Sequence, residues 1–298
     1  MLDGAARQAF LAAASSDDEA ELARAALFIA RIVYRDLDPE PWLAQLAALG
    51  GMAATRLQRL DPEAGLQARV DALNELLFVE QGFTGNEATY EDPRNSFLNE
   101  VLARRTGIPI SLSVVFLDVA RRAGLPSEGV NFPGHFLVRC RATGAHQGQP
   151  RELLVDPFAG GAVLTESDCR RLLRRHLGDE ATFDRRLLVR ADKRAILVRM
   201  LTNLKRVYVG MRSFPQAREV VRLLVELDPE DLAELRDRGL LAFHVGDHTA
   251  ALRDLEAYLE AVSRSGTTPG EHDEEARREY QQVWEHVKTL RRRIASFN

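Results

Sequence analysis

A repeat near the C-terminus constrains the fold of this chain more than any other feature. Ala217 and Ala251 lie 34 residues apart, and each stands at the start of the second helix of a predicted helix-turn-helix unit. The dipeptide Asp228-Pro229 ends the first unit, and Gly246-Asp247 forms the turn of the second. Small residues at matching positions let paired helices approach closely. Residues 195–265 are therefore predicted to form two stacked helical hairpins.

A period of this length is typical of the tetratricopeptide repeat, and the alternative is a generic pair of helical hairpins. Because repeat units do not bury their apolar faces alone, we expect a capping helix over residues 270–298. The helix carries an apolar stripe made of Ala276, Tyr280, Val283, Val287, Leu290, Ile294 and Phe297. Since the mean spacing of this stripe is about 3.5 residues, a homodimer seam is also compatible with it.

The preceding part of the chain is predicted to be α+β. Residues 1–80 carry apolar side chains at helical spacing, and Gly50-Gly51 is expected to interrupt one of the helices. Residues 81–190 begin with turns and continue with two short helices that open near Ser96 and Ser111. Short apolar runs from Gly129 onward then predict antiparallel strands. We therefore expect a helical region, 1–80, that packs on an α+β core, 81–190.

The composition excludes several functional classes. The chain has 298 residues and a net charge of −4, which argues against binding of nucleic acid. The first residues lack the basic flank and the apolar core of a signal peptide, and no apolar run is long enough for a membrane span, so we expect a cytoplasmic protein without membrane contact. Only Cys140 and Cys169 occur, so no disulfide framework is implied. The seven histidines are scattered without metal-ligand spacing, and neither a metal nor a cofactor is expected.

A histidine and an aspartate mark the candidate site of the α+β core. His135 enters one apolar, strand-like run, and Asp156 leaves a second run about 20 residues later. A carboxylate beside an imidazole fixes its tautomer and stabilises its charged form, as in catalytic triads. Because the connection between the two runs is hairpin-sized, we expect His135 and Asp156 to be hydrogen-bonded neighbours on adjacent strands. The alternative is a core histidine that is satisfied by other hydrogen bonds.

Four motifs together resemble the SirB-type bacterial family. They are Asn95-Ser96, Gly107-Ile108-Pro109, Pro133-Gly134-His135-Phe136 and Asp156-Pro157-Phe158, and they occur in the family's order. Members of this family join a transglutaminase-like, papain-like domain to tetratricopeptide repeats. The resemblance covers roughly residues 20–260. It implies that His135 and Asp156 match the histidine and the aspartate of a transglutaminase-like site, but it implies no established reaction.

The chain departs from active members of the wider superfamily at the nucleophile. The resemblance places the catalytic cysteine at a helix N-terminus near residues 109–111, where this chain has Pro109, Ile110 and Ser111. Ser111 is either a helix N-cap or a serine activated by His135. Cys140 and Cys169 are expected to be structural thiols, and Cys140 is expected on the strand face opposite His135.

Three asparagines complete the candidate site. Asn95, Asn99 and Asn131 are expected to bond turns and loops, with contacts to a substrate or an oxyanion as the alternative.

Two functions remain open at this stage. The first is a catalytically lapsed transglutaminase-like protein that binds a protein or peptide partner through its cleft and its repeats. The second is an amide-bond hydrolase or acyltransferase that uses His135 and Asp156 with a non-standard nucleophile. A purely helical scaffold would explain the repeats but not the strands that carry the histidine and the aspartate.

Overall fold

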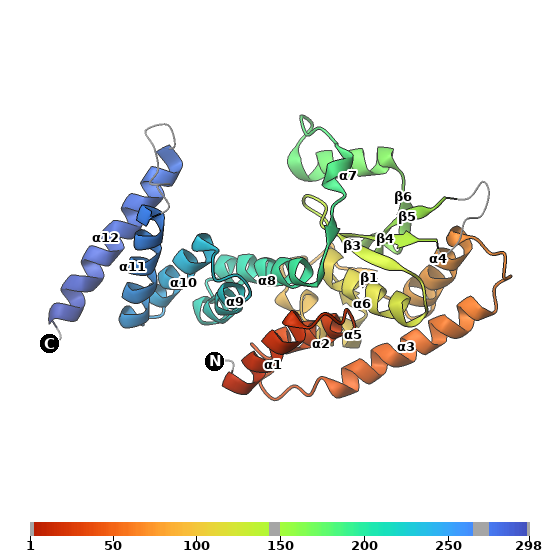
Figure 1. The fold of residues 1–298 in the computed structure, drawn as a ribbon, viewed down its shortest axis with the longest axis horizontal. Coiled ribbons are helices and arrows are strands. Elements are labelled where there is room, and N and C mark those ends of the chain that lie inside the picture. The colour runs from red at the N-terminus through yellow and green to blue at the C-terminus, as the bar shows by residue number, and fades with distance from the viewer. Residues whose placement is uncertain (1–2, 143–149, 265–273, 297–298) are drawn as a thin grey trace. The chain divides into compact units, whose positions relative to one another are not determined.

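The chain forms two compact units, residues 2–203 and residues 204–298. Figure 1 shows the computed structural model, which describes residues 3–142, 150–264 and 274–296. The first unit combines helices with a sheet, and the second contains helices in all of its described secondary structure. The predicted α+β class, with a helical array at the C-terminal end, is confirmed.

Helices dominate the first part of unit 2–203. They are α1 (Gly4–Ser15), α2 (Glu21–Ala30), α3 (Glu40–Gln58) and α4 (Leu66–Asn74), followed by a π-helical turn at Glu75–Glu80. Helix α3 runs unbroken through Gly50-Gly51, so the predicted interruption is wrong. A Cβ atom on Gly50 would lie 2.5 Å from the Cβ atom of Arg122. The missing side chain lets α3 approach the helix that carries Arg122, and this packing outweighs the low helix propensity of glycine.

A central helix and a five-stranded sheet form the core of this unit. The further elements are β1 (Thr84–Gly85), α5 (Leu98–Arg104), β2 (Thr106–Gly107), α6 (Pro109–Arg122), β3 (Ser127–Val130), β4 (Leu137–Arg141), β5 (Glu152–Asp156), β6 (Ala162–Leu164), α7 (Glu166–Leu177) and β7 (Arg190–Ala191). The large sheet has the order β6-β5-β4-β3-β7, and all of its pairs are antiparallel. Every residue of α6 from Pro109 to Ala120 is buried, so this helix is surrounded by protein on all sides.

Both faces of the sheet are covered, which places the ends of β4 and β5 inside the protein. A cluster of Val130, Phe132, Leu137, Cys169 and Leu173 fills the space between the sheet and α7. Helix α6 contacts β3 and β4. In β4 and β5, Val138 pairs with Val155. This antiparallel register brings the start of β4 beside the end of β5.

The second unit is a series of antiparallel helical hairpins. It begins within α8 (Lys193–Gly210) and continues with α9 (Phe214–Leu227), α10 (Leu232–His244), α11 (His248–Arg264) and α12 (Glu274–Ser296). Ala217 and Ala251 are fully buried, as the repeat requires. A Cβ atom on Gly239 in α10 would lie 2.7 Å from the Cδ2 atom of Leu255 in α11. The absence of a side chain at Gly239 therefore permits the close packing of α10 and α11.

Helix α12 packs within the chain through the middle of its predicted stripe. Val283, Val287 and Leu290 are buried in one cluster with residues of α11, and Tyr280 packs at its edge. These side chains are covered by the chain itself rather than by a second copy. Phe297 and the side chains of Ala276 and Ile294, which also belong to the stripe, lie outside the described residues.

Candidate functional site

His135 and Asp156 form the centre of the candidate site. Nε2 of His135 lies 2.9 Å from Oδ1 of Asp156, and each side chain is 6% exposed. The predicted hydrogen bond is thereby confirmed. Its placement needs a correction, because His135 precedes β4 by two residues instead of lying within the strand. It ends a turn in which Gly134 has a φ of 72° and the His135 amide donates to the carbonyl of Phe132.

Asp156 stabilises a turn in addition to its hydrogen bond with the imidazole. It is the last residue of β5, and its Oδ1 accepts hydrogen bonds from the amides of Phe158 (3.0 Å) and Ala159 (3.4 Å). The carboxylate thereby caps the short 3₁₀ turn at Pro157–Ala159. The ring of Phe158 lies edge-on to His135, with centroids 5.9 Å apart. One carboxylate oxygen thus holds the imidazole and also orders the turn that covers it.

A second histidine, absent from the sequence-based site, completes the surroundings of His135. His176 lies in the last turn of α7, and its ring stacks on His135 with centroids 5.7 Å apart and an interplanar angle of 27°. A Cβ atom on Gly134 would lie 2.5 Å from the Cβ atom of His176, so the glycine makes room for this stack. Burial and the neighbouring His135 lower the pKa of His176. The only local signal was a histidine near the end of a helix, and no spacing connected it to residue 135.

Ser111 lies in the first turn of α6, at the position that the family resemblance implies for the nucleophile. The helix begins at Pro109, with Ile108 at the N-cap, so the prediction that Ser111 is the N-cap residue is wrong; Ser111 stands at the third helical position and bonds back to the N-cap amide. Pro109 suits the first helical position because its fixed φ fits a helix and no amide proton is needed there. The Ser111 hydroxyl is fully buried, donates to the carbonyl of Asn95 (2.6 Å) and accepts from the amide of Ile108 (3.1 Å). Its single proton is therefore used by a backbone carbonyl.

Both thiols are buried and poorly suited to act as nucleophiles. Burial raises the pKa of Cys140, in β4, to about 12. Burial, reinforced by the acidic side chains of Asp168 and Glu166, raises the pKa of Cys169 to about 11. A reactive cysteine needs a lowered pKa and access to solvent.

The three asparagines make separate contacts. Asn95 is buried, donates from its amide nitrogen to the carbonyl of Thr89 (2.7 Å) and accepts from Asn86 (3.1 Å). Asn131 accepts from Arg199 at 3.0 Å. Asn99 is buried in α5, and its Oδ1 has no hydrogen-bond partner among the described residues. In the described part of the chain, none of the three asparagine side chains is hydrogen-bonded to His135 or Asp156.

Two further properties bear on the chemistry. Within residues 3–142, 150–264 and 274–296, no three side chains of His, Cys, Asp or Glu are grouped so that they could hold a metal ion. None of the helices in these ranges combines the length and apolarity needed to cross a membrane. The described site consists of an imidazole–carboxylate pair with a stacked second imidazole. Such a pair can take up a proton, and an acyl transfer through the enzyme would additionally need a nucleophile in contact with it.

Comparison with known protein families assigns both parts of the chain. The family described as the transglutaminase-like superfamily matches residues 40–202, and the tetratricopeptide repeat matches residues 204–281. No solved structure matches the chain.

Relatives occur in bacteria and in animals. A UPF0162 protein of Xylella fastidiosa is 39% identical over 251 residues, which are 83% of this chain and 86% of the relative. A UPF0162 protein of Vibrio cholerae is 29% identical over 82% of this chain and 87% of the relative. Human F-box only protein 21 is 35% identical over 62% of this chain, but the match spans only 29% of that protein. Tetratricopeptide repeats follow the transglutaminase-like domain, and a UPF0162 protein matches most of the chain. The chain therefore belongs to the transglutaminase-like superfamily and, within it, to the SirB-type family that includes the UPF0162 proteins.

Proposed function

We propose that this chain is a partner-binding protein whose transglutaminase-like domain no longer performs amide-bond chemistry. The observation that carries the proposal is the state of Ser111, whose buried hydroxyl donates to the carbonyl of Asn95 at 2.6 Å. Breaking this bond would leave a buried carbonyl unsatisfied, at a cost of about 1–3 kcal/mol. The two thiols are buried with raised pKa values. No described side chain is thus prepared to attack a carbonyl beside His135.

The rest of the protein supports a binding role. Tetratricopeptide repeats generally mediate contacts between proteins, and here they follow the transglutaminase-like domain. We expect the partner to be a protein or a peptide that binds the transglutaminase-like domain and the helices of the second unit. The free thiols Cys140 and Cys169 suit a reducing compartment, which supports a cytoplasmic location.

The intact His135–Asp156 pair, at 2.9 Å, favours one second candidate, an amide-bond hydrolase or acyltransferase. In that case Ser111 would exchange its bond to Asn95 for one to His135 when the substrate binds.

One experiment separates the two functions. The tagged full-length chain, Ser111→Ala and His135→Gln are compared in pull-downs and in assays of peptide hydrolysis and amine transfer. We expect all three proteins to retain the same partners and none to turn over substrate. Turnover by the native chain that disappears in both variants would establish the enzyme instead.

A further inference from the structure

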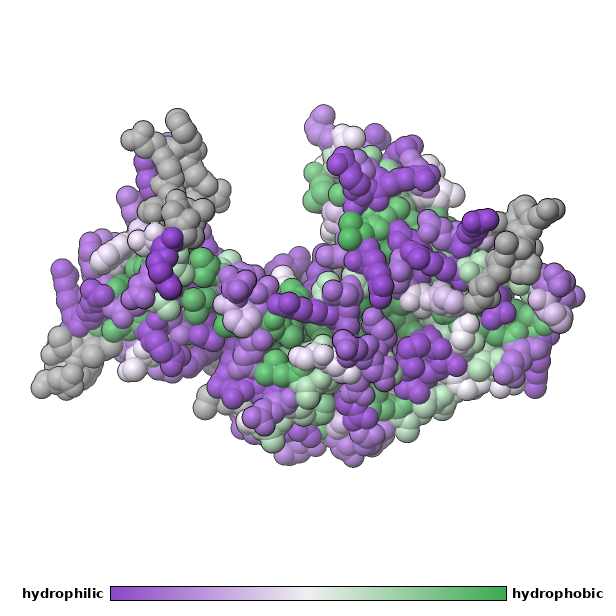
Figure 2. Space-filling model, in the orientation of Figure 1, coloured by the Kyte–Doolittle hydropathy of each residue, from purple (hydrophilic) through white to green (hydrophobic). Residues whose placement is uncertain are grey.

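The outer side of α12 and the end of α10 form an open groove within the second unit. Its cavity has a volume of about 1050 Å³. The residues that line it are Phe243, Arg277, Arg278, Tyr280, Gln281, Gln282, Trp284, Glu285, His286, Lys288 and Thr289. We refer to this set as the α12 groove. Figure 2 shows hydrophobic and hydrophilic residues interleaved on this unit.

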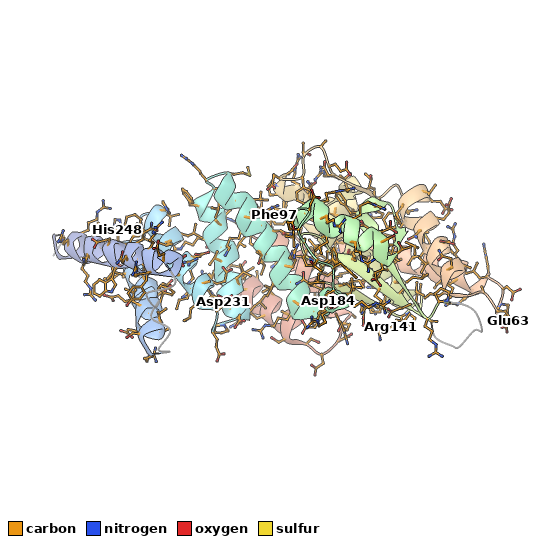
Figure 3. The ribbon with its side chains drawn as sticks, turned by 90° about the horizontal axis from the view of Figure 1, so that it is seen from above. Glu63, Phe97, Arg141, Asp184, Asp231 and His248 are labelled. Carbon is orange, nitrogen blue, oxygen red and sulfur yellow. The ribbon has the colours of Figure 1, made fainter. Side chains whose placement is uncertain are left out.

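Three aromatic rings provide the apolar part of the α12 groove. Trp284 is 38% exposed, although Val283 and Val287 on the same helix are buried. Phe243 and Tyr280 are half-buried, and Phe243 is held by His286, whose ring centroid lies 4.9 Å away. The guanidinium of Arg293 lies 5.9 Å from the centre of the Phe243 ring, and Arg293 also contacts His248, which is labelled at the start of α11 in Figure 3. The groove is thus a fixed aromatic surface with one ring that projects into solvent.

The charged side chains of the α12 groove are mostly cationic. Arg277, Arg278 and Lys288 line it, and Glu285 is its one carboxylate. Lys288 pairs with Glu285 at 2.8 Å and also lies 5.8 Å from the centre of the Trp284 ring. Both partners of this ion pair are at least half exposed, with 50% and 71% of their side chains accessible. Exposed pairs of this kind contribute little, so a carboxylate from a partner can replace Glu285 without a large loss.

We propose that the α12 groove binds an acidic peptide segment of a partner protein, with an apolar side chain placed against Trp284 and carboxylates placed against Arg277 and Lys288. The inference rests on the proposed binding function and identifies the chemistry of the partner. Aromatic residues and arginine dominate the energy of protein interfaces, and cationic rims steer acidic partners and select them. A nucleic acid is disfavoured because the whole chain carries a net charge of −4. A second copy is disfavoured because Val283, Val287 and Leu290, the buried part of the apolar stripe of α12, already pack with residues of α11.

The test uses the full chain and a fluorescein-labelled peptide of the sequence Asp-Glu-Phe-Asp-Glu-Leu-Glu. Fluorescence anisotropy is recorded at low salt with the native chain, Trp284→Ala and Lys288→Glu. Two matched controls lie outside the groove, Met211→Ala for the loss of an exposed apolar side chain and Arg292→Glu for the charge reversal on the same helix. A peptide in which lysine replaces every acidic residue controls for charge.

We expect binding to weaken about tenfold or more in Trp284→Ala and Lys288→Glu, because contacts at hot spots are worth more than about 1.4 kcal/mol. Binding should change less than about twofold in the two controls and should weaken as salt screens the charges. The proposal is wrong if the native chain does not bind the acidic peptide, if it binds the lysine peptide equally well, or if Trp284→Ala has no effect.

Two parallel measurements identify a different occupant and keep this proposal distinct from the proposed function. Tighter binding of a single-stranded oligonucleotide, or a dimer in sedimentation that Trp284→Ala dissociates, would overturn the peptide assignment. A pull-down with Trp284→Ala tests the two proposals separately. If the variant keeps the partners of the native chain, the groove proposal fails while the binding function stands. If the native chain retains no partner, the binding function itself fails.

Discussion

Replacing Asp156 with alanine should destabilise the first unit through two separate losses. The imidazole of His135, 2.9 Å from the carboxylate and on a side chain that is 6% exposed, would lose its partner inside the protein. A buried donor left unsatisfied costs about 1–3 kcal/mol. The short turn at Pro157–Ala159 would lose its cap from Oδ1, which costs about 1 kcal/mol. Together the two losses predict a decrease of about 2–4 kcal/mol in the free energy of unfolding.

Two further variants separate these contributions. Asp156→Asn keeps a side-chain oxygen and the same volume, so it should cost about 1 kcal/mol or less. Asp184→Ala removes a similar cap at Arg185–Leu187, where the Asp184 side chain is 44% exposed and paired with Arg186. Its effect should be clearly smaller than that of Asp156→Ala.

The two tryptophans allow each unit to be followed by itself. Trp42 lies in unit 2–203, and Trp284 lies in unit 204–298. In a Trp284→Phe background, fluorescence during urea unfolding reports on the unit that contains the His135–Asp156 pair. The free energies of unfolding are compared between variants for which the dependence on urea concentration, the m value, is the same. A loss below about 1 kcal/mol for Asp156→Ala would refute the view that this pair is part of the structural core.

Three more predictions follow from local geometry. Gly50→Ala should lower the free energy of unfolding by about 1–3 kcal/mol because its Cβ atom would overlap α6. Gly51→Ala should raise the free energy of unfolding by about 0.5–1 kcal/mol because the space around Gly51 is open. Unfolding in urea checks the sign of both changes. Native Cys140 and Cys169 should react with iodoacetamide far more slowly than in urea, and stoichiometric native labelling within minutes, seen by intact mass, would contradict their raised pKa values. The pKa of His176, measured by NMR, should lie below the usual histidine value. Because the unfolded chain then binds the proton more readily than the folded chain, the free energy of unfolding should fall as the pH drops through about 6.5. His176→Gln should remove this part of the pH dependence.

The sequence was informative wherever one local pattern determined a contact. Two apolar runs joined by a hairpin-sized connection predict a pair of antiparallel strands, so the approach of His135 and Asp156 could be predicted from their places at the ends of these runs. The period of 34 residues likewise places Ala217 and Ala251 between paired helices. The unbroken helix through Gly50 could not be predicted, because the local propensity of glycine gives no information about the helix that packs against it.

The contact between His176 and His135 shows the same limit at the site itself. It depends on where α7 ends after the chain has left the sheet through β6, and no periodicity connects residues 135 and 176. A further ambiguity concerns whether the pair of His135 and Asp156 indicates catalysis or packing. The same carboxylate oxygen binds His135 and caps the turn at Pro157–Ala159, so the pair is needed for packing even without chemistry. Preservation of such a pair in a related chain is therefore no evidence of catalysis unless a nucleophile also contacts the imidazole. In this chain, the first turn of α6 contains Pro109 and Ser111, and the Ser111 hydroxyl donates its proton to a backbone carbonyl. The pair of His135 and Asp156 therefore agrees with the proposal of a protein that binds a partner without catalysis.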